Sequence, residues 1–223
     1  MPRTSRVAPG GMLFHVLNRG VGRMRLFDDD DDYAAFERVL TETLEIQPMR
    51  VCAYCVMPNH WHFVLWPEAD GDLARFMQRL TNMHVQRWQQ HKHLVGTGHV
   101  YQGRYKSFPV ETDEYFYQVA RYVERNALRA KMVEHAEDWR WSSLGCRVHG
   151  TRKEKAILGD WPLPRPRQWR RLVSQPQTEA ELKALRRCVH RSQPYGSDDW
   201  VKRAAVTLGL ESTLRPRGRP KKE

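Results

Sequence analysis

Short runs of apolar and alternating residues along the chain predict four β-strands. They fall at residues 12–17, 50–57, 60–66 and 105–110. Pro58 and Asn59 separate the second run from the third, and such a pair is typical of a turn. Pro67 follows the third run and ends the predicted strand. A glycine-bearing segment, residues 96–103, leads into the fourth strand.

Apolar residues at three- and four-residue intervals predict the helices between and after these strands. The expected helices cover residues 33–44, 72–91 and 114–130, and two shorter helices cover 178–191 and 198–208. Thr112 and Asp113 are a plausible cap for the third helix. Five aspartates, residues 28–32, precede the first helix. A metal site is one interpretation, but negative charge also suits the N-terminal end of a helix dipole, and we favour that interpretation.

The element order is β-α-β-β-α-β with one more helix. This order predicts an α+β fold with a ferredoxin-like or RRM-like antiparallel sheet. Two helices are expected on one face of the sheet, and the other face is expected to be free for a ligand. The composition changes after about residue 150, so we predict a main domain at 1–150. Residues 151–223 are expected to form an extension with a proline- and arginine-rich linker, short helices and a basic tail.

The charge and composition of the chain indicate its kind of partner and its location. The formal net charge is +11 and the isoelectric point is about 9.8. Such an excess favours a polyanionic partner, most often nucleic acid, although a basic enzyme unrelated to nucleic acid stays open. The apolar runs are too short to span a membrane, and the N-terminus has no apolar core of a secretory signal. Four cysteines do not make a disulfide scaffold, so we expect a cytoplasmic protein.

His60 and His62 flank Trp61 in the third predicted strand. Residues two apart in a strand project to the same face, so both imidazoles can reach one metal ion while Trp61 packs into the core. Two surface histidines around a buried tryptophan are the alternative, and the spacing alone does not exclude it.

The helix predicted at 114–130 contains Tyr115, Tyr117 and Tyr122. Only Tyr122 has an amide four residues later, Asn126, on the same helical face. An amide oxygen is a suitable ligand for Mg²⁺ or Mn²⁺ beside two imidazoles. One helix is therefore able to present a nucleophile and a third metal ligand to the sheet.

Cys52 and Cys55 form a CxxC pattern shortly before the histidines. Their odd separation in a strand predicts opposite faces, so they are not expected to share an ion with His60 and His62. Buried thiols are the favoured interpretation.

Three segments, MPNHWHFVLWP, YQGRYKSFPV and RYVERNALRAKMV, occur in this order. In sequence and spacing they resemble the single-tyrosine HUH transposases, and more narrowly the REP-associated tyrosine transposases, which process repetitive extragenic palindromes. The resemblance runs from about residue 12 to 144, and the RPRGRP tail is also similar. The family usually reads Asn-Pro-Val-Arg-Ala where this chain reads Asn126-Ala127-Leu128-Arg129-Ala130.

The resemblance implies a role for each candidate residue. His60, His62 and Asn126 would hold a divalent ion, Mg²⁺ or Mn²⁺, that polarises the scissile phosphate. Tyr122 would attack phosphorus and form a 5′-phosphotyrosine. Single-stranded DNA would then be cleaved and rejoined at REP-type hairpins by a catalytic domain at 1–150. Because the covalent link keeps the phosphodiester energy, no nucleotide cofactor is needed, and the chain has no GxxxxGK[ST] phosphate loop.

Seven cations are candidate DNA contacts. Arg19, Arg23, Arg104 and Lys106 lie near predicted strand ends. Arg215, Arg217 and Arg219 form a run that resembles an AT-hook, which binds a minor groove; a non-specific electrostatic tail is the alternative.

Two other functions stay open at this stage. The sheet is also suited to a non-catalytic, RRM-like nucleic-acid-binding module. The other open function is that of an HUH nickase in plasmid replication or conjugation. A monomer and a homodimer are both compatible with the sequence, and a nucleoid-associated location follows from the expected DNA partner.

Overall fold

The computed structural model describes residues 7–215. Four strands form one antiparallel sheet in the order β2-β3-β1-β4, with β1 paired to both β3 and β4. The strands are β1 Leu13–Arg19, β2 Arg50–Met57, β3 His60–Trp66 and β4 Lys106–Val110. The predicted α+β fold is confirmed, and the second and third strands begin and end where the sequence predicted.

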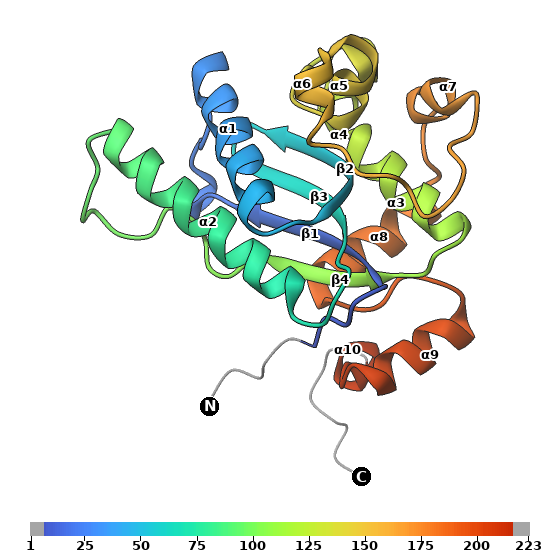
Figure 1. Ribbon diagram of the computed structural model, residues 1–223. Coiled ribbons are helices and arrows are strands. Elements are labelled where there is room, and N and C mark those ends of the chain that lie inside the picture. Colours follow the sequence, from blue (N-terminus) through green and yellow to red (C-terminus); the bar gives the residue numbers. More distant parts are fainter. Residues whose placement is uncertain (1–6, 216–223) are drawn as a thin grey trace.

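Helices occupy both sides of this sheet (Figure 1). In chain order, the helices between and after the strands are η1 Val21–Arg23, α1 Asp30–Ile46, α2 Asp72–His91, α3 Glu114–Glu124, α4 Asn126–Arg129, η2 Ala136–Asp138, α5 Ser143–His149, α6 Arg152–Lys155, α7 Trp169–Ser174, α8 Glu179–Arg191, α9 Asp198–Thr207 and α10 Glu211–Leu214. The sequence patterns did not predict α5, α6, α7 or α10, which are seven residues long or shorter. No helix of residues 7–215 is long and apolar enough to cross a membrane.

The first face of the sheet is covered by α1 and α2, as predicted. Their apolar stripes bury Phe36 and Phe76 completely, together with Trp61 and Phe63 from β3. Burying side chains of this size removes a large apolar area from water and is the main stabilisation of the domain. Trp61 also donates from Nε1 to the Tyr101 hydroxyl, at 2.9 Å. Trp61 thus packs into the core between its two histidine neighbours.

The second face of the sheet was expected to be free, and that expectation is wrong. A second core covers most of it, with α3 and α8 packed against the sheet (Figure 1). Phe116 and Val119 of α3 and Leu185 of α8 are buried there. The amphipathic pattern of α3 required a partner surface, and the second face is the surface that its apolar side meets. At the end of this face near His60, the described residues leave a pocket.

Both edges of the sheet are covered by chain that follows residue 140. Gly159 donates its N–H to Val51 O at the β2 edge, and Tyr195 donates to Pro109 O at the β4 edge. Unpaired edge strands are templates for aggregation, and these contacts cover both edge strands, β2 and β4. The division into domains at residue 150 stays a prediction, although segments on both sides of it meet in one core.

The helix predicted at 114–130 is interrupted. The first segment, α3, ends at Glu124 and the second, α4, begins at Asn126, with Arg125 between them. Glu124 is fully buried and accepts from Ser143 Oγ at 2.5 Å and from Trp169 Nε1 at 2.6 Å. Burial raises the pKa of Glu124, and the two donors act in the opposite direction. These bonds fix the end of α3 to α5 and α7, two residues after Tyr122.

Cys52 and Cys55 lie on the same face of the sheet, which corrects the sequence prediction. A register shift between Val51 and Ala53 inserts an irregularity into β2, so the simple alternation fails there. Both thiols belong to the second core and are completely buried, as favoured. Burial raises the pKa of each thiol to about 12, so both stay protonated near neutral pH.

Candidate active site

His60 and His62 project to the second face of β3, as their spacing predicted. Their ring centroids lie 5.0 Å apart, and they pair with Arg19 and Leu17 of β1. His62 is buried, with 4% of its surface exposed, whereas His60 is half-buried at the open end of the face. The alternative of two surface histidines is therefore wrong.

Each of these imidazoles has a hydrogen-bond partner at Nδ1. The Asn59 side chain accepts from His60 Nδ1 at 2.6 Å, because an amide oxygen only accepts. His62 Nδ1 lies 2.9 Å from Nε2 of His15, a buried residue of β1. The Nε2 atom of His60 is thereby left with its lone pair. Metal-binding histidines are typically oriented by such a contact at the other ring nitrogen.

Burial controls the charge of this pair. It lowers the pKa of His60 to about 4, with smaller effects from Arg19 and Arg129. It also lowers the pKa of His62 well below the usual value, and His60 and His15 add to the effect. Both imidazoles are neutral at pH 7, which is the form that binds a metal ion.

Tyr122 lies opposite the histidines on α3. Its ring centroid is 5.9 Å from that of His62, at an interplanar angle of 85°. The Arg129 guanidinium carbon lies 4.2 Å from the Tyr122 ring centroid, which places a cation over the ring face.

The other two tyrosines of α3 are directed elsewhere. Tyr117 donates its hydroxyl to Pro164 O at 2.6 Å, and Tyr115 packs edge-on against Tyr195. Of the three tyrosines of α3, the tertiary structure brings Tyr122 to the histidines.

Asn126 is buried at the first position of α4. Its Oδ1 accepts from Arg129 Nη2 at 2.8 Å, and its Nδ2 is buried with no hydrogen-bond partner. A carbonyl oxygen has two lone pairs, so Oδ1 keeps one that is available to a ligand. Within residues 7–215, no group of three His, Cys, Asp or Glu side chains is placed to hold a metal ion. Two imidazoles and one amide are nevertheless a donor set that fits Mg²⁺ or Mn²⁺.

These residues line one pocket of about 610 Å³, called here the site pocket. Its lining joins His60, His62, Tyr122 and Asn126 to a set of basic and polar side chains: Arg19, Arg104, Lys106, Arg129, Arg186, Gln102 and His190. Arg19, Arg104 and Lys106 are thus gathered at the candidate site, as their places near strand ends suggested. A cationic pocket of this kind attracts phosphate.

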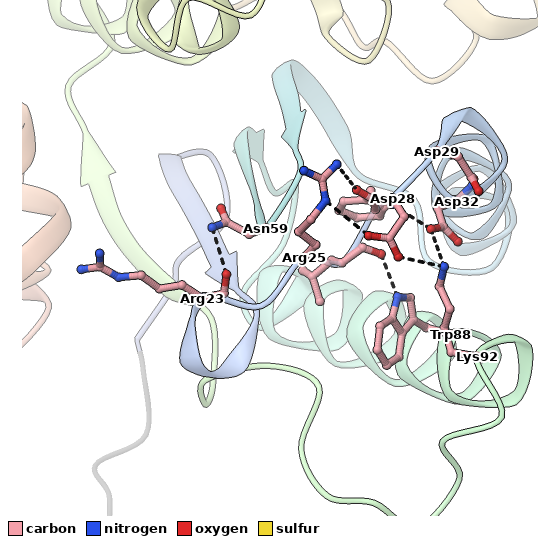
Figure 2. A network of polar contacts seen from close by, with 10 residues as sticks. Arg23, Arg25, Asp28, Asp29, Asp32, Asn59, Trp88 and Lys92 are labelled. Carbon is pink, nitrogen blue, oxygen red and sulfur yellow. Dashed lines mark hydrogen bonds and ion pairs between the residues drawn. The ribbon is translucent and has the colours of Figure 1, made fainter.

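The other predicted DNA contacts are not in this pocket. Arg23 is exposed in η1 and its side chain points away from the neighbouring polar network (Figure 2). Arg215 is exposed after α10. Arg217 and Arg219 lie outside the described residues, so their role stays a prediction.

The aspartate cluster is the start of a helix, as favoured above. Asp29 caps α1 by accepting from the N–H of Asp32. Lys92, the residue after α2, contacts Asp32 at 2.8 Å and Asp28 at 3.1 Å (Figure 2). On the other side of this network, Asn59 donates from Nδ2 to Arg23 O at 3.2 Å. Because Asn59 also holds His60, the loop after β1 is fixed to the candidate site.

Sequence reasoning missed three groups of the site. His15 has no spacing pattern that marks it as a site residue, because its contact with His62 depends on strand pairing between residues 47 apart in the sequence. Arg129 follows Asn126 by three residues, a helical spacing that was a usable signal. Arg186 and His190 come from α8, in the extension, and no local pattern connects them to the site.

Solved structures of two transposases are similar to this chain. A REP-associated tyrosine transposase bound to a REP hairpin matches with a TM-score of 0.54 and 20% identity. The match covers 72% of this chain and 93% of that one. A putative transposase from Deinococcus radiodurans R1 gives a TM-score of 0.38 and 17% identity, over 55% of this chain and 96% of that one. No curated protein matches this chain.

The fold is thus similar to that of a REP-associated tyrosine transposase. The sequence model described as "Transposase IS200 like" matches residues 10–126, which is 117 of the 223 residues. The chain belongs to the IS200-like transposase family. The matched segment contains both histidines of the pair, Tyr122 and Asn126.

Proposed function

We propose that this transposase cleaves and rejoins single-stranded DNA through a covalent bond to Tyr122. The observation that carries the proposal is the site pocket, where Tyr122 faces His62 among several cations. The REP hairpin in the fold neighbour supports hairpin-containing, REP-type DNA as the substrate class. A non-catalytic binding module does not need a tyrosine and a neutral histidine pair in one basic pocket.

His60 and His62, through Nε2, and Asn126, through Oδ1, would hold a divalent ion such as Mg²⁺ or Mn²⁺. When bound, the ion supplies Lewis-acid polarisation of the scissile phosphate. The unpartnered Asn126 Nδ2 and the single Arg129 bond at Oδ1 leave this amide free to orient toward a ligand. Asn59 and His15 orient the two rings through their contacts at Nδ1 of His60 and His62.

Tyr122 carries the chemical step. Its oxygen forms a bond to phosphorus, and the bond from phosphorus to the 3′ oxygen breaks. The net transfer moves the phenol proton to the departing 3′ oxygen, which gives a 5′-phosphotyrosine and a 3′-hydroxyl. The Arg129 cation lies over the Tyr122 ring and lines the site pocket, so it is placed to attract the scissile phosphate. Rejoining is the reverse reaction, so it needs no nucleotide cofactor.

The assignments outside the pocket are also proposals. Residues 1–150 are the catalytic domain, and residues 151–223 add DNA contacts through α8 and the basic tail. Arg186 and His190 of α8 support this role, since both line the site pocket. We place the protein in the cytoplasm with the nucleoid, as a monomer or homodimer.

The proposal is tested by trapping the adduct. The full chain is incubated with a single-stranded oligonucleotide that forms a REP-type hairpin, with Mg²⁺ or Mn²⁺ and with EDTA. We expect an SDS-resistant protein–DNA band in the metal samples alone, and mass spectrometry that places the nucleotide on Tyr122. No adduct with either metal, while the hairpin is bound, would favour a binding module.

A second prediction concerns His15. Replacing it by leucine keeps the apolar contact with Phe108 but removes the hydrogen bond to His62. We expect Mn²⁺ to bind about 10- to 100-fold more weakly, which is the usual effect of losing such a supporting contact. Calorimetric titration of the protein with Mn²⁺ measures this without catalysis.

The matched control is His84→Leu. His84 is equally buried but lies in the first core, where its partner is the Tyr101 hydroxyl. Its replacement is expected to lower stability and leave Mn²⁺ affinity within about twofold, because it touches no ligand. Equal Mn²⁺ affinities of wild type and His15→Leu would show that His15 does not position His62 for metal binding.

A further inference from the structure

The C-terminal part of α8 forms one wall of the site pocket. Arg186, Val189 and His190 line the pocket together with Tyr122 of α3. Arg186 and His190 are four residues apart, so they lie on the same side of the helix. The apolar side of α8, which includes Leu185, is buried in the second core. The extension thus presents a guanidinium and an imidazole to the candidate site.

Contacts just after α8 hold this end of the helix in place. Tyr195 donates its N–H to Pro109 O of β4 at 2.9 Å, and its hydroxyl to Gln118 Oε1 of α3. Gln118 precedes Tyr122 by four residues, so it lies one turn away on the same helix. The end of α8 that carries His190 is therefore tied to a strand and a helix that also line the site pocket.

The lining of the site pocket offers few acceptors for the phenol proton. Tyr122 must lose its proton to attack, and among the described residues no Asp or Glu lines the pocket. The side chains of arginine and lysine have no acceptor lone pair. His60 and His62 are committed to the proposed ion and to their contacts at Nδ1. His190 is the remaining imidazole, and imidazole is well suited to accept and release a proton near neutral pH.

Both groups of this transfer are uncommitted within the part of the chain that the structure describes. There, the His190 side chain makes no hydrogen bond, ion pair or ring contact, and the Tyr122 hydroxyl makes no hydrogen bond. His190 is exposed, whereas Tyr122 has 7% of its surface exposed. An exposed imidazole is able to pass a proton on to water. His190 is thus placed between the buried phenol and the solvent.

We propose that His190 is the general base that accepts the Tyr122 proton during cleavage. The inference rests on the proposed function, because it takes Tyr122 as the nucleophile. His190 lies outside residues 10–126, which the transposase family model matches. The proposal therefore assigns a catalytic residue to the extension.

The proton balance of this step is complete with water as the co-reactant. The O–H bond of Tyr122 breaks and its proton moves to a ring nitrogen of His190. The tyrosine oxygen bonds to phosphorus, and the bond from phosphorus to the 3′ oxygen breaks. The 3′ oxygen takes a proton from water, and the resulting hydroxide removes the proton from His190. Rejoining runs these steps in reverse.

The test measures adduct formation by His190→Ala with Mn²⁺ and a saturating hairpin oligonucleotide. The rate is expected to fall about a hundredfold or more, the usual effect of losing a general base. Hairpin affinity in EDTA is expected to stay within about twofold of wild type. Imidazole added to the solution should restore the rate of the variant at least about tenfold, because it replaces the missing base. A residue with a structural role alone would show no such rescue.

A second substrate separates this role from protonation of the leaving group. It carries sulfur in place of the scissile 3′ oxygen, and a thiolate leaves without a proton far more readily than an alkoxide. Tyr122 still needs a base, so His190→Ala should be slowed by about the same factor on both substrates. Recovery of the wild-type rate on the sulfur substrate would make His190 an acid for the leaving oxygen and overturn the proposal.

His149→Ala is the matched control. His149 is also an exposed histidine in the last turn of a helix, α5, but it does not line the site pocket. Its replacement should leave the adduct rate within about twofold of wild type. An unchanged rate in His190→Ala, or no rescue by imidazole, overturns the inference alone. A wild-type protein that forms no adduct overturns the proposed function, and the inference with it.

Discussion

Replacing Tyr122 by phenylalanine is expected to lower covalent adduct formation at least about a thousandfold, because the hydroxyl that forms the bond to phosphorus is gone. The phenyl ring keeps its contacts with His62 and Arg129, so the site pocket should hold its shape. Hairpin affinity in EDTA is expected to stay within about twofold of wild type. SDS gels measure the adduct, and fluorescence anisotropy measures binding.

Tyr117→Phe is the control for this variant. Tyr117 is on the same helix, but its hydroxyl bonds to Pro164 O and does not line the site pocket. This variant should form the adduct at a rate close to that of wild type. An adduct that persists in Tyr122→Phe would show that another residue is the nucleophile.

The second large effect concerns stability against acid. Three buried histidines and the half-buried His60 are neutral in the folded protein, because burial lowers the pKa of each one. The pKa is lowered to about 3 for His15 and His84 and to about 4 for His60, and well below the usual value for His62. In the unfolded chain each histidine has a pKa of about 6.5. Below about pH 6.5 the unfolded state therefore binds more protons than the folded state.

The free energy of unfolding should consequently fall as the pH falls through this window. Each histidine contributes up to about 1.4 kcal/mol per pH unit, and four together up to about 5–6 kcal/mol per unit. The fall in the free energy of unfolding begins near pH 6.5. For each histidine it continues until the pH passes the pKa in the folded state, which is about 4 for His60. If the total stability is about 5 kcal/mol, the low end of the usual range, unfolding is expected at about pH 5.6, above the range in which carboxylates titrate.

Urea unfolding followed by tryptophan fluorescence, in EDTA between about pH 7.5 and pH 5, measures this slope. His84→Gln is the informative variant, because glutamine keeps a partner for Tyr101 and does not titrate. Its slope should be about one quarter smaller than that of wild type. A free energy of unfolding that stays constant over this pH range would contradict the neutral, buried state of these histidines.

Glu124 ties the end of α3, two residues after Tyr122, to neighbouring helices. The carboxyl is buried under α5 and α7, bonded to Ser143 and Trp169. Both partners lie in residues 143–169, where the sequence indicated no site residue. A nucleophile placed by packed, hydrogen-bonded elements needs less rearrangement to reach its target.

The sequence determined the features that depend on local geometry. Alternation in the third strand placed His60 and His62 on one face and Trp61 on the other, because side-chain direction in a strand has a period of two. Spacing of apolar residues predicted α2 with its observed bounds. The offset of four residues predicted one face for Tyr122 and Asn126, and both line the site pocket even though the helix is interrupted at Arg125.

Only the tertiary structure decided the features that depend on distant segments. His15 meets His62 through strand pairing, and α8 brings Arg186 to the site pocket from the extension. The same holds for the covered second face and for the shared face of the two cysteines, which follows from the irregularity in β2. Such contacts depend on which elements pack together, and a periodic pattern reports only that a face is apolar, without naming its partner.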